Sequence, residues 1–350
     1  MIKRRLTGLI LSFIILVSSS KNIFANSKYN KELIDGDTNQ ISITLNKKAF
    51  EKSDDIILVN EDSLIDAISA TPLAYQLDAP IITTKWIKMD KETLKYIKEL
   101  GSKRVIIIGG LKNVSKTVER NLENMGLEIQ RIYGENRYDT SLMIAEEMKK
   151  IDKDVSKLLI VNKRARIENS IALYSYAAKL NMPIVWSTDD DFKDIKKYIK
   201  KNNIEDIYAI GNSEKFTYEV TNSIKNVQMI KEINKSDTNT QMIKLLQRGD
   251  IKDIYTVNVE GDSNYNNTEN ISLGVVAAKE NKPILITGES LSYSQEKFIK
   301  KNNIKNLIQV GSETKDYSII NTLLSKNFIS ASILILFILL IIFRAFIYQS

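Results

Sequence analysis

The sequence contains no cysteine and no histidine among its 350 residues. Without cysteine there can be no disulfide bond and no thiol nucleophile. Without histidine the usual imidazole general base is missing, and so are the His/Cys ligand sets of zinc sites. We therefore expect neither a metal nor another cofactor, and we predict no catalytic residue.

Proline is rare, and three of the four prolines recur in one register. They are Pro80, Pro183 and Pro283, spaced 103 and 100 residues apart, and each precedes an apolar, strand-like run. Glycines that follow a second apolar run recur in the same order, at Gly109, Gly211 and Gly311. A period this long indicates three homologous domains, because the repeats of a solenoid are much shorter.

Both ends of the chain carry long uncharged runs. Basic residues at 3–5, followed by an apolar stretch and a small residue, predict a secretory signal peptide over 1–25, with an uncleaved N-terminal anchor as the alternative. The uncharged run between Lys326 and Arg344 predicts a transmembrane helix over 328–347. The alternative there, a buried core helix, is disfavoured because the run is apolar on every face.

The formal net charge of +7 comes mostly from these two ends. When their six basic residues are set aside, residues 26–325 carry a formal charge of +1. A nearly neutral body argues against nonspecific binding of polyanions driven by overall charge, and we predict no nucleic-acid partner.

Apolar runs alternate with helical patterns within each repeat. In the first repeat, Ile56–Val59, Pro80–Thr83 and Val105–Ile108 are predicted strands, whereas Leu64–Leu77 and Lys91–Leu100 are predicted helices. Continuous apolar strands between helices are typical of a parallel sheet that is covered on both faces. The predicted fold class is therefore α/β, with three tandem parallel-sheet units. The expected bounds of these units are 36–134, 135–232 and 233–325.

The most specific motif lies at the junction of the first two units. It runs from Arg131 to Ala145 and contains Asn-Arg-Tyr-Asp-Thr-Ser at 136–141. Together with the runs at 63–74, 79–83 and 105–110, this motif makes the sequence resemble the cell wall binding repeat 2 family of Gram-positive surface proteins. The resemblance covers about residues 36–325 and is weakest in the third unit.

The resemblance implies three Toprim-like modules in a pseudo-threefold arrangement. It also implies noncovalent attachment to an anionic cell wall polysaccharide. In the family, apolar residues after the module proline have been linked to that attachment. Their counterparts here are Ile81, Ile82, Ile184, Val185, Ile284 and Leu285.

Two helix starts supply the other candidate polymer-binding residues. Asp66 lies three residues after Ser63 at the head of an apolar helix, where it serves either as a helix cap or as a ligand. The second start is the family hallmark, whose residues are Arg137, Tyr138, Asp139, Thr140 and Ser141. These residues either cap a helix and join two modules, or present Arg137 to a phosphate or carboxylate, which suits its planar guanidinium.

Three weaker patterns leave their alternatives open. The turn at Gly109-Gly110 could present backbone N–H groups to an anion or simply allow tight packing. The acidic run at 189–191 could bind a divalent cation, although such runs more often start a solvated helix. Trp86 and Trp186 each follow a module strand and could stack on sugars or pack in a core.

Two departures from the family pattern bear on function. The hallmark is complete only at 137–141, and the positions that match Asp66 are Asn169 and Glu269. We predict a non-catalytic wall-binding protein, anchored as a single-pass membrane protein with its extracellular part facing the cell wall. One alternative is a degenerate trio that binds surface-layer or other envelope proteins. Another is a wall-turnover hydrolase that uses two carboxylates.

Overall fold

The computed structural model describes residues 29–165, 167–230, 235–246, 249–259, 270–288 and 290–311. The first unit contains α2 (Thr38–Ala49), β2 (Asp55–Asn60), α3 (Leu64–Gln76), β3 (Ile81–Thr84), α4 (Lys91–Leu100), β4 (Arg104–Ile108), α5 (Lys116–Asn124) and β5 (Glu128–Ile132). The second contains α6 (Arg137–Ile151), β6 (Lys157–Asn162), α7 (Ile167–Lys179), β7 (Ile184–Ser187), α8 (Lys193–Asn202), β8 (Asp206–Ile210), α9 (Glu214–Ser223) and β9 (Val227–Ile230). The third contains α10 (Lys235–Leu246), β10 (Asp253–Asn258), α11 (Leu273–Lys279), β11 (Ile284–Thr287), α12 (Tyr293–Lys301) and β12 (Asn306–Val310).

Each unit is built on a four-stranded parallel sheet. The strand orders are β3-β2-β4-β5 and β7-β6-β8-β9, and the third sheet reads β11-β10-β12-β1. The central strands are mostly apolar between their ends because helices cover both faces; Ile56 to Val59 of β2, for example, are fully buried. The predicted α/β class with three parallel-sheet units is confirmed.

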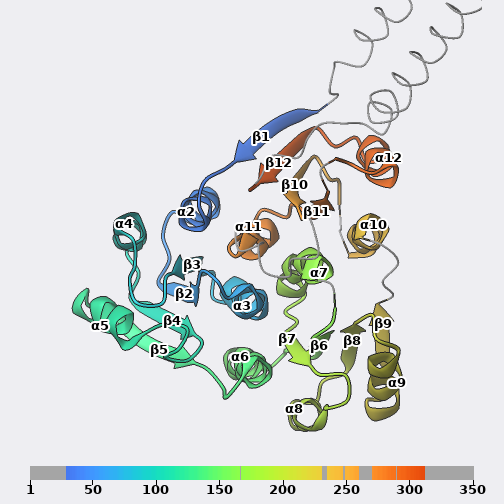
Figure 1. Ribbon diagram of the computed structural model, residues 1–350, viewed down its shortest axis with the longest axis horizontal. Helices are drawn as coiled ribbons and strands as arrows, with labels where there is room; N and C mark the ends of the chain where they lie inside the picture. Colours follow the sequence, from blue (N-terminus) through green and yellow to red (C-terminus); the bar gives the residue numbers. More distant parts are fainter. Residues whose placement is uncertain are drawn as a thin grey trace, which may run out of the picture.

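The third sheet is completed by a strand from the opposite end of the described chain. β1 (Asn30–Ile34) pairs in parallel with β12, with Asn30 opposite Asn306 and Ile34 opposite Val310. The side-chain amide of Asn30 also donates to Oδ1 of Asn306 at 2.9 Å. The trio therefore closes on itself, as Figure 1 shows at the upper edge of the ribbon.

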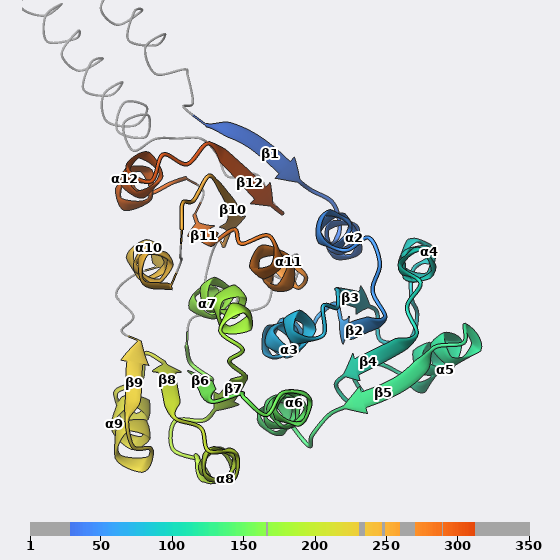
Figure 2. The ribbon, with the colours of Figure 1, turned by 180° about the vertical axis from the view of Figure 1, so that it is seen from behind.

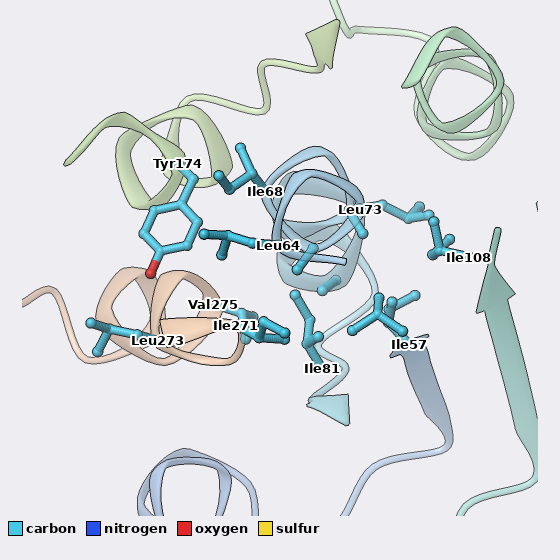
Figure 3. Packing of buried hydrophobic residues seen from close by; sticks show 14 of the residues in the cluster. Ile57, Leu64, Ile68, Leu73, Ile81, Ile108, Tyr174, Ile271, Leu273 and Val275 are labelled. Carbon is cyan, nitrogen blue, oxygen red and sulfur yellow. The ribbon is translucent and has the colours of Figure 1, made fainter. Parts of the chain in front are cut away.

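Three helices form the centre of the molecule. Helices α3, α7 and α11 pack against one another, and the three sheets surround them (Figures 1 and 2). Tyr174 is fully buried there, and its hydroxyl donates to the carbonyl oxygen of Asn270 at 3.0 Å. A Cβ atom at Gly274 would lie 2.6 Å from the Tyr174 ring, so this close approach of α7 and α11 requires glycine (Figure 3).

Helices α2, α6 and α10 lie at the junctions between neighbouring sheets (Figure 2). Helix α6, for example, follows β5 of the first sheet and packs against β7 of the second and against α3. Its N-terminus therefore meets the edge of one unit while its body belongs to the next. The family-like motif at 136–141 falls at this N-terminus.

The predicted localisation needs correction. Within the described ranges, no helix has the length and apolar character needed to cross a membrane, so single-pass anchoring has no support. The predicted signal peptide at 1–25 and the predicted transmembrane helix at 328–347 lie outside the described residues.

Candidate functional site

A cleft of about 460 Å³ lies at the carboxyl ends of the strands of the first sheet. In the sheet, β3 lies on one side of β2 and β4 lies on the other, so the direction of the strand order reverses next to β2. Ligands of open α/β sheets bind at such a switch point. The walls are the turns that follow β2, β4 and β5. Among the lining residues are Ser63, Asp66, Lys112, Asn113, Arg137 and Thr140.

Asp66 is the buried acid of this cleft, with a residue exposure of 7%. Its Oδ2 accepts a hydrogen bond from the side-chain amide of Asn113 at 3.0 Å. Burial raises the pKa of Asp66, and this effect is opposed by the hydrogen bonds from Asn113 and Ser63 and by the positive charge of Arg137. Ser63 occupies the N-cap position of α3 but makes no side-chain cap hydrogen bond. The side chains of Ser63 and Asp66 thus interact with each other and with the cleft.

Arg137 contributes an exposed cation to the cleft. It is the first residue of α6, and its charge acts on Asp66 across the junction between units. Among the described residues, its guanidinium has no ion-pair or hydrogen-bond partner. This contrasts with Arg131, whose guanidinium pairs with Glu119 at 2.6 Å and donates to the Gly109 carbonyl oxygen at 2.7 Å. The donors of Arg137 therefore remain available to a ligand.

The other hallmark residues build the turn that presents Arg137. Asn136 caps α6, because its Oδ1 accepts from the backbone N–H groups of Tyr138 at 2.8 Å and Asp139 at 3.1 Å. The Thr140 hydroxyl accepts from the Gly134 N–H at 3.0 Å. A Cβ atom at Gly134 would lie 2.2 Å from the Asp139 Cβ, so the turn needs glycine. Most of the motif is therefore architecture.

Two hallmark side chains turn away from the cleft. Tyr138 is partly buried and packs against the main core. The Ser141 hydroxyl donates to the Tyr138 carbonyl oxygen at 2.7 Å and accepts from the backbone N–H of Trp186 at 3.0 Å. The second of these hydrogen bonds joins α6 to β7. Their positions do not support direct polymer contact by these two side chains.

The six apolar candidates lie in the core. Ile81, Ile82, Ile184, Val185, Ile284 and Leu285 are each exposed by 1% or less. Figure 3 shows Ile81 among the packed residues beneath the central helices. In this structure these side chains pack in the core and have no surface to offer a polymer.

The two tryptophans have different environments. Trp186 is buried at 2% exposure, and its indole N–H donates to the Ser69 hydroxyl oxygen at 2.9 Å, so it packs between units. Trp86 is 52% exposed. The sequence analysis treated both residues alike, although Trp186 lies three residues after Pro183, within β7, and Trp86 lies six residues after Pro80, beyond β3.

The acidic run at 189–191 serves local structure. Asp189 pairs with Arg164 at 3.2 Å, and Asp190 pairs with Lys215 at 2.5 Å. Oδ1 of Asp191 accepts from the Lys193 N–H at 3.1 Å, at the start of α8. In the part of the chain that the structure describes, no group of three or more acidic side chains is placed to hold a metal ion.

Sequence reasoning missed Lys112 and Asn113, which lie in the turn between β4 and α5. This turn spans 109–115, whereas the corresponding turn of the second unit spans only 211–213. Gly109 has φ +101°, and a Cβ atom there would lie 2.8 Å from the Asn113 amide nitrogen, so glycine lets the turn fold over the cleft. The extra length of the turn, visible in the sequence, was the available signal.

Comparisons with known proteins agree with this architecture. The curated relatives include the N-acetylmuramoyl-L-alanine amidase LytC of Bacillus subtilis, 28% identical over 272 residues, which are 77% of this chain and 53% of that protein. The amidase enhancer of the same organism is 33% identical over 178 residues, which are 51% of this chain and 24% of that protein. The chain thus matches about half of the first relative's length and a quarter of the second's.

Solved structures show the same fold. Cwp8 from Clostridium difficile superposes with a TM-score of 0.72 at 24% identity, covering 90% of this chain and 54% of that chain. Cwp6 from the same organism gives 0.68 at 24% identity, covering 82% and 46%.

The family model of cell wall binding domain 2 (CWB2) matches residues 35–119 and 131–221, which together make up half of the chain. These matches cover most of the first two units, and the turns that line the cleft fall within them. The family supports association with the cell wall, and the predicted single-pass membrane localisation is not supported. The chain belongs to the cell wall binding domain 2 family.

Proposed function

We propose that this chain is a non-catalytic protein that attaches noncovalently to an anionic polysaccharide of the cell wall through the cleft between its first two units. The observation that carries the proposal is Arg137, an exposed guanidinium held at the cleft with no ion-pair partner in the described ranges. A guanidinium can form two parallel hydrogen bonds to a phosphate or carboxylate group.

The rest of the cleft suits a sugar polymer. Lys112 is exposed and adds a second positive charge at the cleft. The N-terminus of α6 presents the positive end of a helix dipole, which favours an anion. Asp66 and Asn113 offer a carboxylate and an amide for hydroxyl groups. Such a cleft recognises an anionic group beside polar ring substituents.

A binding role is favoured over hydrolysis by the environment of Asp66. Its pKa is raised by burial, and the other groups that act on it are an amide, a hydroxyl and a guanidinium. Glycosidases instead work with a pair of carboxyl groups set across the scissile bond. Asp62 and Glu135 also line the cleft, but neither is among the groups that act on Asp66. The sequence also lacks the histidine that zinc amidases need.

The test is cosedimentation of the protein with Gram-positive cell walls, before and after the anionic polymer is stripped by acid. We expect Arg137→Ala to weaken binding about tenfold at low salt, and less as salt rises, because an ionic contact is lost. Arg120→Ala removes the same side chain from the exposed surface of α5 and is the matched control.

Two results would count against the proposal. If Arg137→Ala binds cell walls as tightly as the wild-type chain does, the cleft is not the binding site. Binding of the wild-type chain that survives complete stripping would favour the alternative, an envelope protein partner, over a polysaccharide.

A further inference from the structure

Exposed apolar side chains gather beside the cleft. Trp86, Ile87, Leu111 and Tyr133 are between 51% and 56% exposed. They follow three strands of one sheet, since Trp86 and Ile87 come after β3, Leu111 after β4 and Tyr133 after β5. Large aromatic side chains are seldom left this exposed without a partner when they cluster.

The indole of Trp86 is held in place by the turn that lines the cleft. Its Nε1–H donates to the Leu111 carbonyl oxygen at 3.0 Å, and its own carbonyl oxygen accepts from the Ser115 N–H at 2.8 Å. The polar edge of the ring is thus satisfied within the protein. What remains exposed is apolar ring surface on a fixed support.

Tyr133 touches the same turn. Its Cδ2 atom lies 3.5 Å from the position that a Cβ atom at Gly110 would occupy. Gly110 and Leu111 both line the cleft, together with Asp66 and Arg137. The two aromatic side chains therefore both adjoin the turn that lines the candidate site.

The exposed ring of Trp86 is a feature of the first unit that the second does not share. Trp186 lies within β7, three residues after Pro183, whereas Trp86 lies six residues after Pro80 and beyond the end of β3. Trp186 is packed in the core, where Ser69 satisfies its indole N–H. The residue of the second unit that matches Trp86 in register is Asp189, whose side chain is only 8% exposed.

We propose that Trp86, assisted by Tyr133, forms a stacking subsite for the apolar face of a pyranose ring in the same polymer whose anionic group binds Arg137. This inference rests on the function proposed above. A pyranose ring presents C–H groups on its face and hydroxyl groups around its edge. An aromatic face is electron-rich and attracts positively polarised groups such as these C–H groups.

A sugar fits this patch better than a folded protein does. A stable protein interface buries about 800 Å² on each partner. Here the aromatic surface lies at the rim of a polar cleft, next to a buried carboxylate and to the Arg137 guanidinium, which has no ion-pair partner among the described residues. This combination matches a glycan that alternates ring faces with charged groups.

The experiment measures affinity and tryptophan accessibility with one probe, the polysaccharide released by acid from Gram-positive cell walls. We expect Trp86→Ala to weaken binding about tenfold, by the same factor at low and high salt, because stacking involves no net charge. Trp86→Phe keeps an aromatic face and should lose less than about threefold. Bound polymer should shield Trp86 from acrylamide quenching, and buried Trp186 contributes little to that signal.

Tyr218→Ala is the matched control, because Tyr218 is a 67% exposed aromatic side chain on α9, away from the cleft. The subsite is overturned, and the proposed function kept, if Arg137→Ala weakens binding while Trp86→Ala binds normally and Trp86 stays quenchable. Absence of any polymer binding by the wild-type chain would overturn both. A Trp86-dependent interaction with polymer-free walls would replace the sugar with a protein partner.

Discussion

The first and second units share one sheet order but end differently at their carboxyl edges. Equivalent asparagines, Asn60 and Asn162, are the last residues of the equivalent strands β2 and β6. In the first unit, the Asn60 amide donates to the Asn113 carbonyl oxygen at 2.6 Å and so supports the long turn that lines the cleft. In the second unit, the Asn162 amide donates to the Thr188 carbonyl oxygen and to Oδ1 of Asp189, both at 3.1 Å.

The second edge is filled by its own side chains. Asp189, whose side chain is only 8% exposed, pairs with Arg164. A Cβ atom at Gly211 would lie 2.6 Å from the Phe216 ring, so this aromatic side chain packs directly beneath the short turn. The comparison shows that the sheet supplies a position for a site, while the length and sequence of one turn decide whether that position is open.

The largest expected effect of a single change is at the turn that carries Arg137. Gly134→Ala would place a methyl group within 2.8 Å of the Thr140 nitrogen and closer still to Asp139. We expect a loss of about 3 kcal/mol in the free energy of unfolding, measured with urea, because backbone atoms must shift.

Gly126→Ala provides the control for this prediction. Gly126 has φ +84°, and nothing lies within 4 Å of the position that a Cβ atom would take there, so only backbone strain is added, about 1 kcal/mol. Equal losses for both variants would show that the turn at Gly134 tolerates a side chain and would break the distinction between the open and closed edges.

A smaller effect of opposite sign is expected at the buried acid. Asp66→Asn gives the first unit the residue type that the second has at Asn169. Burial raises the pKa of Asp66. At a pH where the carboxyl group is charged in the unfolded chain, folding therefore has to bury an unfavourable charge, which lowers the free energy of unfolding. The variant should be more stable at neutral pH by about 1 kcal/mol.

The pH dependence gives the sign test. The gain should shrink as pH falls and vanish below the ordinary Asp pKa of 3.8, where the carboxyl group is protonated in both folded and unfolded chains. Asp62→Asn, an exposed acid of the same cleft, should leave unfolding unchanged. A gain that persists undiminished at low pH would point to altered packing and not to charge.

The smallest effect is expected in the second unit. Arg164→Ala removes the ion pair with Asp189, but the arginine side chain is 64% exposed and Asn162 still donates to the acid. We expect a loss of about 0.5 kcal/mol that disappears in high salt. A loss several times larger would mean that this pair, and not the short turn, keeps the second edge closed.

The sequence predicted much of the fold because burial on both faces leaves a clear pattern. The helix expected at Lys91–Leu100 is α4 with the same bounds, and Gly101 ends it in a left-handed conformation with φ +69°. Strand β2 extends one residue beyond the predicted Ile56–Val59 at each end. Apolar strands alternating with amphipathic helices admit few other arrangements.

Strand β1 could not be found in this way. Its sequence, Asn-Lys-Glu-Leu-Ile, is mostly polar because it is an exposed sheet edge. Its partner β12 lies far along the chain, with Asn306 276 positions after Asn30. Local patterning carries no information on such a pairing.

The site was predicted in pieces. Ser63 with Asp66 and the Arg137 motif were candidates on separate grounds, and their convergence depends on the strand order that brings the ends of β2, β4 and β5 together. Lys112 and Asn113 lie in an irregular turn without periodicity. The apolar candidates were taken from the family resemblance, although a continuous apolar run predicts burial.

The pairing of β1 with β12 has a consequence for how the chain can be divided and made. A fragment that contains only consecutive residues of the third unit would lack the fourth strand of its sheet. During synthesis, β1 emerges before any other described strand but finds its sheet neighbour last. Closing so long a loop costs entropy that rises only with the logarithm of its length. The first two units can thus fold while the rest of the chain is still being synthesised, whereas the sheet of the third unit is complete only after Val310 has been synthesised.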